Sequence, residues 1–244
     1  MIIFISPPFG NYFPYFKVKN VEFIPINGSF TLEKRDGLIP QILKTLRYSF
    51  QDKGWVNKIG LRNKGIDYAI SQHKKGNYEH DIVSIAIMKT SEVTDLLDKI
   101  PRNMNIEINV SCPNVDKEGS PPRNIEQFLN NERKWCSLKL SPMTDEKTID
   151  HYYNKGFRIF HCSNTLPVEN GGLSGPALIP YTKKLTNYIK SNYPEAKVVC
   201  GGGIKTVDDI ESYRRNGGDY FSISTLCFSP FLFCKLLYKV GGLP

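Results

Sequence analysis

Eight short runs rich in β-branched and other apolar residues recur along this chain of 244 residues, separated by longer segments with helical periodicity. The runs are Ile2 to Ser6, Val21 to Ile26, Asp81 to Ala86, Asn105 to Val110, Cys136 to Leu140, Arg158 to Ser163, Lys197 to Cys200 and Tyr220 to Ser224. Strands that alternate with helices are typical of a parallel sheet. Eight of them predict a closed (β/α)8 TIM barrel of the α/β class, a single domain over residues 1–244.

Helical patterns occupy most of the segments between those runs, near residues 91–99, 124–131, 145–155, 178–192, 206–216 and 229–239. Ser91, Thr144 and Thr206 stand before three of these patterns and are followed by acidic residues, as expected of N-caps. The segment from about 28 to 65 fits no single strand or helix and is too long for an ordinary connection. It predicts a functional insertion with one or two small hairpins.

Composition and charge argue against several classes of protein. Hydrophobic residues make up 40% of the chain, and no apolar run reaches the about 20 residues that span a bilayer. The six cysteines are scattered without a CxxC pair, so neither a disulfide framework nor a metal site is expected. The net charge of +8 is spread over several segments without a nucleic-acid motif. We therefore expect a cytoplasmic protein that acts on a small molecule, without a nucleic-acid or membrane partner.

Two glycine-rich or hydroxyl-rich loops follow the last two predicted strands. Gly201-Gly202-Gly203-Ile204 follows the seventh strand, and Ser224-Thr225 follows the eighth. Loops at these two positions of a barrel can direct several backbone N–H groups at a phosphate. A glycine run alone would equally well be a plain turn, but the paired loops favour a phosphate site.

A polar motif follows the fourth predicted strand. Asn109 and Ser111 alternate with Ile108 and Val110, so the polar side chains share one face of the strand, which should look into the barrel mouth. Cys112 lies just beyond, in a proline-containing turn, where a thiol with a lowered pKa could accept a proton. Without its polar neighbours, this cysteine would be interpreted as an inert buried thiol.

Lys139 interrupts an apolar strand, at residues 136–140. A buried lysine is costly unless it is paired or functional, so this one is expected to face a charged ligand. It could form a Schiff base or stabilise a developing anion. The alternative is a lysine at an exposed strand end.

Amide side chains stand beside the remaining glycine-rich segments. Asn57 lies close to Gly60, and Asn164 and Thr165 precede the glycines of residues 171–175. An amide presents a donor and an acceptor side by side, which matches the edge of a planar imide or pyrimidine ring. Taken singly, each would more often be a turn residue.

Together these segments resemble the dihydroorotate dehydrogenases, FMN-dependent barrels that oxidise dihydroorotate to orotate in pyrimidine synthesis. The resemblance covers about residues 28–235. It rests on SFTLEKRDG (29–37), NKIGLRNKGID (57–67), INVSCPN (108–114), LKL (138–140), SNT (163–165), GGLSGPAL (171–178) and GGGI (201–204). Cysteine at position 112 is similar to the soluble class, whose members are commonly dimers, so the resemblance implies a homodimer.

The resemblance implies a role for each matched residue. Cys112 would be the catalytic base that takes a proton from dihydroorotate while a hydride passes to the flavin, and Lys139 would favour the charge that develops on the flavin. The implied FMN-binding residues are Ser29, Asn109, Lys139, Ser163, Gly175, Gly202, Gly203, Ser224 and Thr225. The implied substrate-binding residues are Asn57, Gly60, Leu61, Asn109, Asn114, Asn164 and Thr165.

The sequence departs from the family pattern at several places. Gly28 stands where the family has a lysine, bulky residues at 7–9 replace the small ones that let the flavin lie close to the first strand, and the chain is shorter than usual. Two alternatives therefore stay open. One is a non-redox barrel enzyme that binds a substrate phosphate and uses Lys139 as a Schiff-base or electrostatic residue. The other is a flavin-binding protein that has lost turnover.

Overall fold

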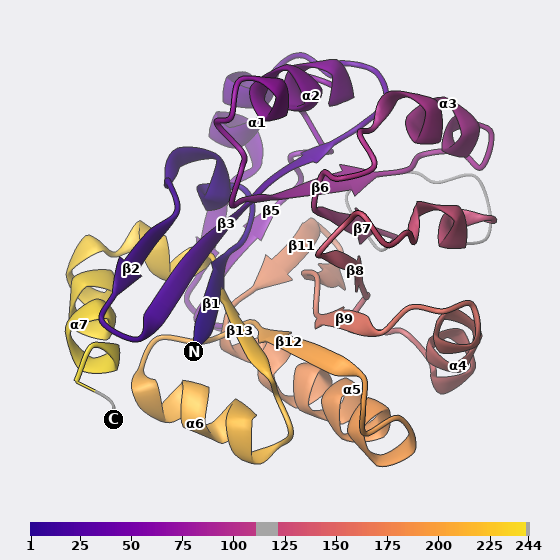
Figure 1. Ribbon diagram of the computed structural model, residues 1–244. Helices are drawn as coiled ribbons and strands as arrows, with labels where there is room; N and C mark the ends of the chain where they lie inside the picture. Colours follow the sequence, from indigo (N-terminus) through magenta and orange to yellow (C-terminus); the bar gives the residue numbers. More distant parts are fainter. Residues whose placement is uncertain (111–121, 243–244) are drawn as a thin grey trace.

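A closed barrel of eight parallel strands forms the centre of the computed structural model, which describes residues 1–110 and 122–242 (Figure 1). The strands are β1 (Ile2–Ile5), β3 (Val21–Phe30), β6 (Ile82–Ala86), β7 (Ile106–Asn109), β8 (Cys136–Lys139), β9 (Ile159–Cys162), β12 (Lys197–Gly201) and β13 (Tyr220–Ile223). β1 closes the ring by pairing in parallel with both β3 and β13. A short strand, β2 (Phe16–Val18), pairs antiparallel with β3. All eight predicted strands are present, so the predicted (β/α)8 barrel is confirmed.

Helices surround the barrel, most of them where periodicity predicts them (Figure 1). These are α3 (Glu92–Lys99), α4 (Glu146–Asn154), α5 (Ile179–Asn192), α6 (Val207–Arg215) and α7 (Pro230–Val240). The predicted helix at 124–131 is wrong, because this segment forms only a four-residue 3-10 helix, η2 (Ile125–Phe128). The Asn130 side chain accepts hydrogen bonds from the backbone N–H groups of Glu132 and Arg133, and this local bonding competes with a longer helix. Two helices that the sequence analysis missed are α1 (Leu38–Thr45) and α2 (Ile66–Lys74).

The predicted N-caps are only partly correct. Thr206 caps α6 in a reciprocal capping box with the acidic residue of the first turn. Asp145, not Thr144, caps α4, because its carboxylate accepts the backbone N–H of Thr148 at 2.8 Å. Ser91 precedes α3 but makes no side-chain capping bond.

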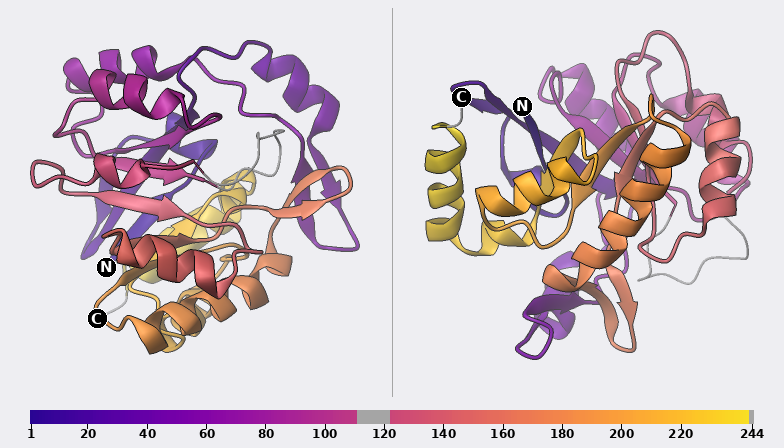
Figure 2. Two further views of the ribbon diagram at one scale, coloured as in Figure 1. Left: turned by 90° about the vertical axis from the view of Figure 1, so that its right-hand side faces the viewer. Right: turned by 90° about the horizontal axis from the view of Figure 1, so that it is seen from below.

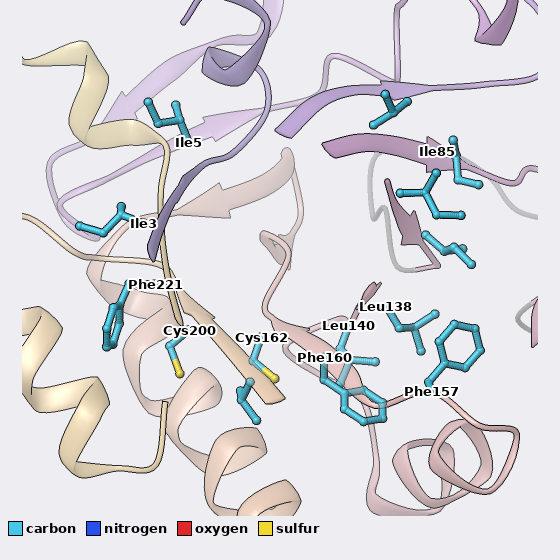
Figure 3. Close-up of a cluster of buried hydrophobic side chains, with 14 of the residues drawn as sticks. Ile3, Ile5, Ile85, Leu138, Leu140, Phe157, Phe160, Cys162, Cys200 and Phe221 are labelled. Atoms are coloured by element: carbon cyan, nitrogen blue, oxygen red, sulfur yellow. The ribbon is translucent and has the colours of Figure 1, made fainter. Parts of the chain in front are cut away.

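Apolar side chains fill two separate layers, one outside the strands and one inside the barrel. Figure 3 shows the outer layer, in which residues such as Ile3, Leu138 and Phe221 point from the strands toward the helices. The inner layer is a small cluster near the amino ends of the strands: Phe4, Ile26, Ile82 and Val199, with Trp135 and Tyr220 packed against it. Each such buried side chain contributes about 1.5–3 kcal/mol of hydrophobic stabilisation. Because this inner cluster fills the barrel near the amino ends of the strands, the interior is open to ligands at the carboxyl ends, where two cavities lie.

A second sheet stands beside the barrel at the end away from the two chain termini (Figure 2). It contains β4 (Arg47–Ser49), β5 (Gly54–Asn57), β10 (Leu166–Val168) and β11 (Gly171–Ser174), in the order β10-β11-β5-β4. The predicted hairpin in the insertion at 28–65 is thus confirmed as β4 and β5. Its pairing with β11 joins two segments that are far apart in the sequence and builds a wall at the barrel mouth.

Candidate active site

A chain of hydrogen bonds crosses the barrel above the apolar plug. Asn164 Nδ2 donates to Asn109 Oδ1 at 3.1 Å, and Asn109 Nδ2 donates to Ser29 Oγ at 3.1 Å. The Ser29 and Ser84 hydroxyl oxygens lie 2.8 Å apart, and Ser84 donates to Glu107 Oε1 at 3.1 Å. Since connected polar groups in a low-dielectric interior hold one another in place, this network orients the side chains at the barrel mouth.

Three ionisable side chains from neighbouring strands meet at the floor of the mouth. Glu107, Lys139 and His161 are 0%, 7% and 2% exposed. Lys139 Nζ lies 3.7 Å from Glu107 Oε1, and His161 Nδ1 lies 2.5 Å from Glu107 Oε2. Lys139 is therefore a buried, ion-paired residue, and the alternative of an exposed strand end is wrong.

The charge state of this cluster follows from burial and pairing. Burial acts to raise the pKa of Glu107, but the charge of Lys139 and the charge that His161 carries in the same acidic range outweigh it, together with hydrogen bonds from His161 and Ser84, and lower that pKa to about 2. Burial lowers the pKa of His161, although the neighbouring carboxylate opposes this. At neutral pH Glu107 is ionised opposite Lys139, and His161 is uncharged.

A cavity of about 260 Å³, which we call the loop cavity, opens beside the ends of β12 and β13. Its walls include the loops that follow these strands and an aromatic pair, Trp55 and Phe228, whose rings stack 4.3 Å apart. Pro7, Pro8 and Phe9 also line it, so the bulky residues after β1 border the cavity without closing it. The loop cavity therefore combines a glycine-rich wall with an apolar one.

Gly202 makes the close approach in the glycine loop possible. Its φ is +97°, and a Cβ atom there would lie 2.6 Å from Leu178 Cβ. The Tyr213 hydroxyl donates to the Gly202 carbonyl at 2.7 Å, and the Thr182 hydroxyl donates to the Gly201 carbonyl at 2.9 Å. These two hydrogen bonds fix the backbone of the loop. No side chain at position 202 stands between this backbone and the cavity.

A second cavity of about 290 Å³, the amide cavity, lies next to the loop cavity. The two share lining residues, among them Asn57, Lys139, Asn164 and Thr165. The amide cavity is also bordered by Ser29, Gly60, Leu61 and Asn109. Lys139 thus stands where two ligands in adjoining cavities would meet.

Gly28 lies on the wall of the amide cavity and cannot readily be replaced. Its φ is +118°, and a Cβ atom there would lie 2.5 Å from the Ser84 carbonyl oxygen. The family's lysine would therefore require a different local backbone. Arg62 and Lys64 also border this cavity, but Arg62 donates to the Asp36 carbonyl and the Lys64 ammonium lies 4.3 Å from the centre of the Tyr68 ring.

The structure brings the described predicted site residues together at these two cavities. The loop cavity is lined by Asn57, Lys139, Ser163, Asn164, Thr165, Gly175, Gly202, Gly203, Ser224 and Thr225. The amide cavity is lined by Ser29, Asn57, Gly60, Leu61, Asn109, Lys139, Asn164 and Thr165. Cys112 and Asn114 lie outside the described residues.

Glu107 and His161 were not among the predicted site residues. Period-two alternation is the signal that could have found them, because Glu107 stands two residues before Asn109 and His161 two residues before Ser163. Both therefore share the inner face with a residue already singled out.

The fold and the two cavities define the class of protein: an α/β-barrel enzyme with a glycine-rich loop, a hydroxyl-bearing loop and a buried lysine at the carboxyl ends of its strands. The chain belongs to the dihydroorotate dehydrogenase family, because the model of that family, described as dihydroorotate dehydrogenase, matches residues 15–155. Members of this family are FMN-dependent oxidoreductases, as the resemblance implied.

Similar sequences and a similar solved structure come from dihydroorotate dehydrogenases. The catalytic subunit of dihydroorotate dehydrogenase B (NAD(+)) from Staphylococcus carnosus is 28% identical, covering 79% of this chain and 72% of its own. The same subunit from Anoxybacillus flavithermus is 27% identical, over 87% of this chain and 76% of its own. The ligand-free dihydroorotate dehydrogenase of Eimeria tenella superposes with a TM-score of 0.70 at 16% identity, covering 98% of this chain and 82% of that one. This last likeness confirms the fold.

Within residues 1–110 and 122–242, no helix has both the length and the apolar character to cross a bilayer. The same residues contain no group of three or more histidine, cysteine, aspartate or glutamate side chains placed to hold a metal ion.

Proposed function

We propose that this protein is an FMN-dependent oxidoreductase that oxidises dihydroorotate, or a related dihydropyrimidine, to orotate or the corresponding pyrimidine. The observation that carries the proposal is that Lys139 lines both cavities, so a planar cofactor in one and a ring substrate in the other would meet beside it. When bound, FMN supplies a hydride acceptor. The family and the names of the relatives support the same reaction.

The walls of the loop cavity fit FMN. The glycine loop presents backbone without side chains, and the hydroxyls of Ser224 and Thr225 stand nearby, a combination that suits a phosphate. The stacked pair of Trp55 and Phe228 suits the apolar face of a ring. The proposed FMN-binding residues are Lys139, Ser163, Gly175, Gly202, Gly203, Ser224 and Thr225, which line the loop cavity, and Ser29 and Asn109, which line the adjoining amide cavity.

Lys139 would stabilise negative charge on the cofactor. Its ammonium is held by the buried carboxylate of Glu107, so it is oriented before any ligand binds. A Schiff-base role needs an uncharged amine as nucleophile. The ion pair with Glu107 therefore supports the electrostatic role better than the Schiff-base alternative.

The amide cavity would bind the substrate ring. Asn109 and Asn164 offer donors and acceptors that match the imide edge of a dihydropyrimidine. By the family resemblance, Cys112 takes the proton from one ring carbon while the hydride leaves the adjacent carbon, and the two electrons of the broken C–H bond at the first carbon form the C=C bond. The proposed substrate-binding residues are Asn57, Gly60, Leu61, Asn109, Asn114, Asn164 and Thr165, of which Asn114 lies outside the described residues.

The glycine at position 28 leaves the amide cavity without the lysine ammonium that would pair with an anionic substrate. A charged hydrogen bond from the family's lysine would contribute about 1.5–3 kcal/mol. Gly28 cannot supply it. We therefore include related dihydropyrimidines, and a higher KM for dihydroorotate than in lysine-bearing relatives is expected.

An anaerobic visible spectrum tests the proposal. Purified protein, supplied with FMN, should show the flavin bands, and dihydroorotate or a related dihydropyrimidine should bleach them. Cys112→Ala should slow the bleaching severely, whereas Cys234→Ala, at an exposed position on α7, should not. Protein that is colourless and gains no flavin absorbance with added FMN would refute the proposal.

The same proposal includes the domain organisation, cellular location, oligomeric state and electron acceptor of the protein. We take residues 1–244 as one FMN-binding barrel domain that acts on a small molecule in the cytoplasm, with neither nucleic acid nor membrane as partner. The resemblance to the soluble class supports a homodimer, for which sedimentation velocity is the test. The relatives' names carry NAD(+), which makes NAD(+) the first electron acceptor to assay.

A further inference from the structure

His161 presents its two ring nitrogens to different surroundings. Nδ1 lies 2.5 Å from Glu107 Oε2, deep in the floor of the barrel mouth. Nε2 lies on the other side, 3.3 Å from the point where a Cβ atom of Gly201 would stand, and His161 lines the loop cavity. The imidazole therefore bridges a buried carboxylate and the proposed cofactor cavity.

The hydrogen bond to Glu107 decides which nitrogen carries the proton. A carboxylate only accepts hydrogen bonds, and Glu107 is ionised, so the uncharged His161 carries its proton on Nδ1. Nε2 then has an unprotonated lone pair. Among the described residues, Glu107 is the hydrogen-bond partner of the His161 side chain, through Nδ1. Nε2 is therefore able to accept a proton.

His161 faces one carboxylate, one ammonium group and residues that do not titrate. Across the described ranges, its charged neighbours are Glu107 from β7 and Lys139 from β8. From β12 and β13, Gly201 and Ser222 line the same cavity as His161, and neither residue titrates. With His161 neutral, the cluster of Glu107, Lys139 and His161 carries no net charge.

We propose that His161 is a positioning residue that holds Glu107 through Nδ1 and takes up a proton at Nε2 when negative charge enters the loop cavity. This proposal rests on FMN binding there. A hydride brings two electrons and one proton to the cofactor, so the cavity gains one negative charge. A solvent proton then adds to Nε2, and the resulting imidazolium, with Lys139 and Glu107, gives the floor one positive charge opposite the new negative one.

The midpoint potential of bound FMN as a function of pH measures that proton. Each proton taken up with two electrons changes the potential by about 30 mV per pH unit. In the wild type between pH 7 and 8.5, one proton on the cofactor and one on His161 predict a fall of about 60 mV per pH unit. His161→Asn keeps a donor for Glu107 but cannot titrate, so its slope should fall to about 30 mV per pH unit.

Matched variants separate this role from a structural one. His151→Asn, at an exposed position of α4, should keep the wild-type slope. His161→Gln is the second non-titrating variant, should the first fold poorly by circular dichroism, and both should bind FMN within threefold of the wild type in a fluorescence titration. The proposal is overturned if the wild-type slope is already about 30 mV per pH unit, if a non-titrating variant keeps the wild-type slope, or if both lose FMN. Wild-type protein that binds no FMN refutes the proposed function instead, so the two failures are distinguishable.

Discussion

Replacing Glu107 by glutamine is the most direct test of the buried charge cluster. The side chain is 0% exposed, and its carboxylate meets Lys139 at 3.7 Å and His161 at 2.5 Å. Glutamine keeps the shape but removes the charge, so the buried Lys139 ammonium loses the Glu107 carboxylate as an ion-pair partner. Removing one partner of a buried pair is strongly destabilising for this reason, typically by about 3–5 kcal/mol.

The lowered pKa of Glu107 gives a second value for the contribution of its charge to the free energy of unfolding. A shift from 4.5 to about 2 corresponds to about 3 kcal/mol of folding free energy at neutral pH, since each pKa unit is worth about 1.4 kcal/mol. This value lies at the lower end of the destabilisation expected when one partner of a buried ion pair is removed. For a chain of this size, 3 kcal/mol is a fall in Tm of about 6–12 °C.

The pH dependence has a definite sign. Because the folded pKa lies below the unfolded one, the stabilisation is complete above about pH 4.5 and is lost as the pH falls toward 2. Urea unfolding of the apoprotein should therefore show that wild type is about 3 kcal/mol more stable than Glu107→Gln at pH 7, and this difference should be clearly smaller at pH 3.5.

A surface glutamate provides the control for this measurement. Glu132 pairs with Arg102 at 2.6 Å, but both side chains are more than half exposed, so Glu132→Gln should cost at most about 1 kcal/mol. A Glu107→Gln variant as stable as the Glu132→Gln control, or a gap that stays constant down to pH 3.5, would show that the buried carboxylate is not held ionised by its partners.

Three further predictions concern the cavities and the thiols. Gly202→Ala should weaken FMN binding at least tenfold in a fluorescence titration, because the new Cβ atom would overlap the side chain of Leu178. An unchanged affinity would show that the loop can move enough to accommodate the methyl group. Gly28→Lys should lower the Tm rather than restore dihydroorotate affinity, since its Cβ atom would lie 2.5 Å from a carbonyl oxygen and the strained backbone costs about 1–3 kcal/mol. Among the described cysteines, the exposed Cys234 should react quickly with a thiol reagent at pH 8, whereas burial raises the pKa of Cys162 and should protect it until the protein unfolds; equal rates by mass spectrometry would contradict this.

The sequence by itself determined the eight barrel strands and their order, and it placed the proposed site residues at the ends of those strands. Each inner strand is a local run of β-branched residues, and the glycine and amide residues stand directly after such runs, so local pattern was sufficient. In a parallel barrel all strand ends meet at one mouth, and Asn109 and Gly202 therefore converge although they come from different strands.

Local pattern did not determine the lengths of the irregular segments. The 3-10 helix at Ile125–Phe128 is cut short by side-chain bonds of Asn130, and such competition is not visible in apolar periodicity. The four-stranded sheet pairs Gly172 with Asn57, and no turn or repeat in the sequence connects these two residues.

Only the tertiary structure decided which polar side chains are partners. Glu107 and His161 are 54 residues apart, and each looks like an isolated polar residue in its own strand. Alternation shows which face of a strand a side chain occupies, but the neighbour on that face depends on how the closed barrel sets the register of adjacent strands. The charged floor beneath the two cavities exists because ring closure places β7, β8 and β9 side by side in that register.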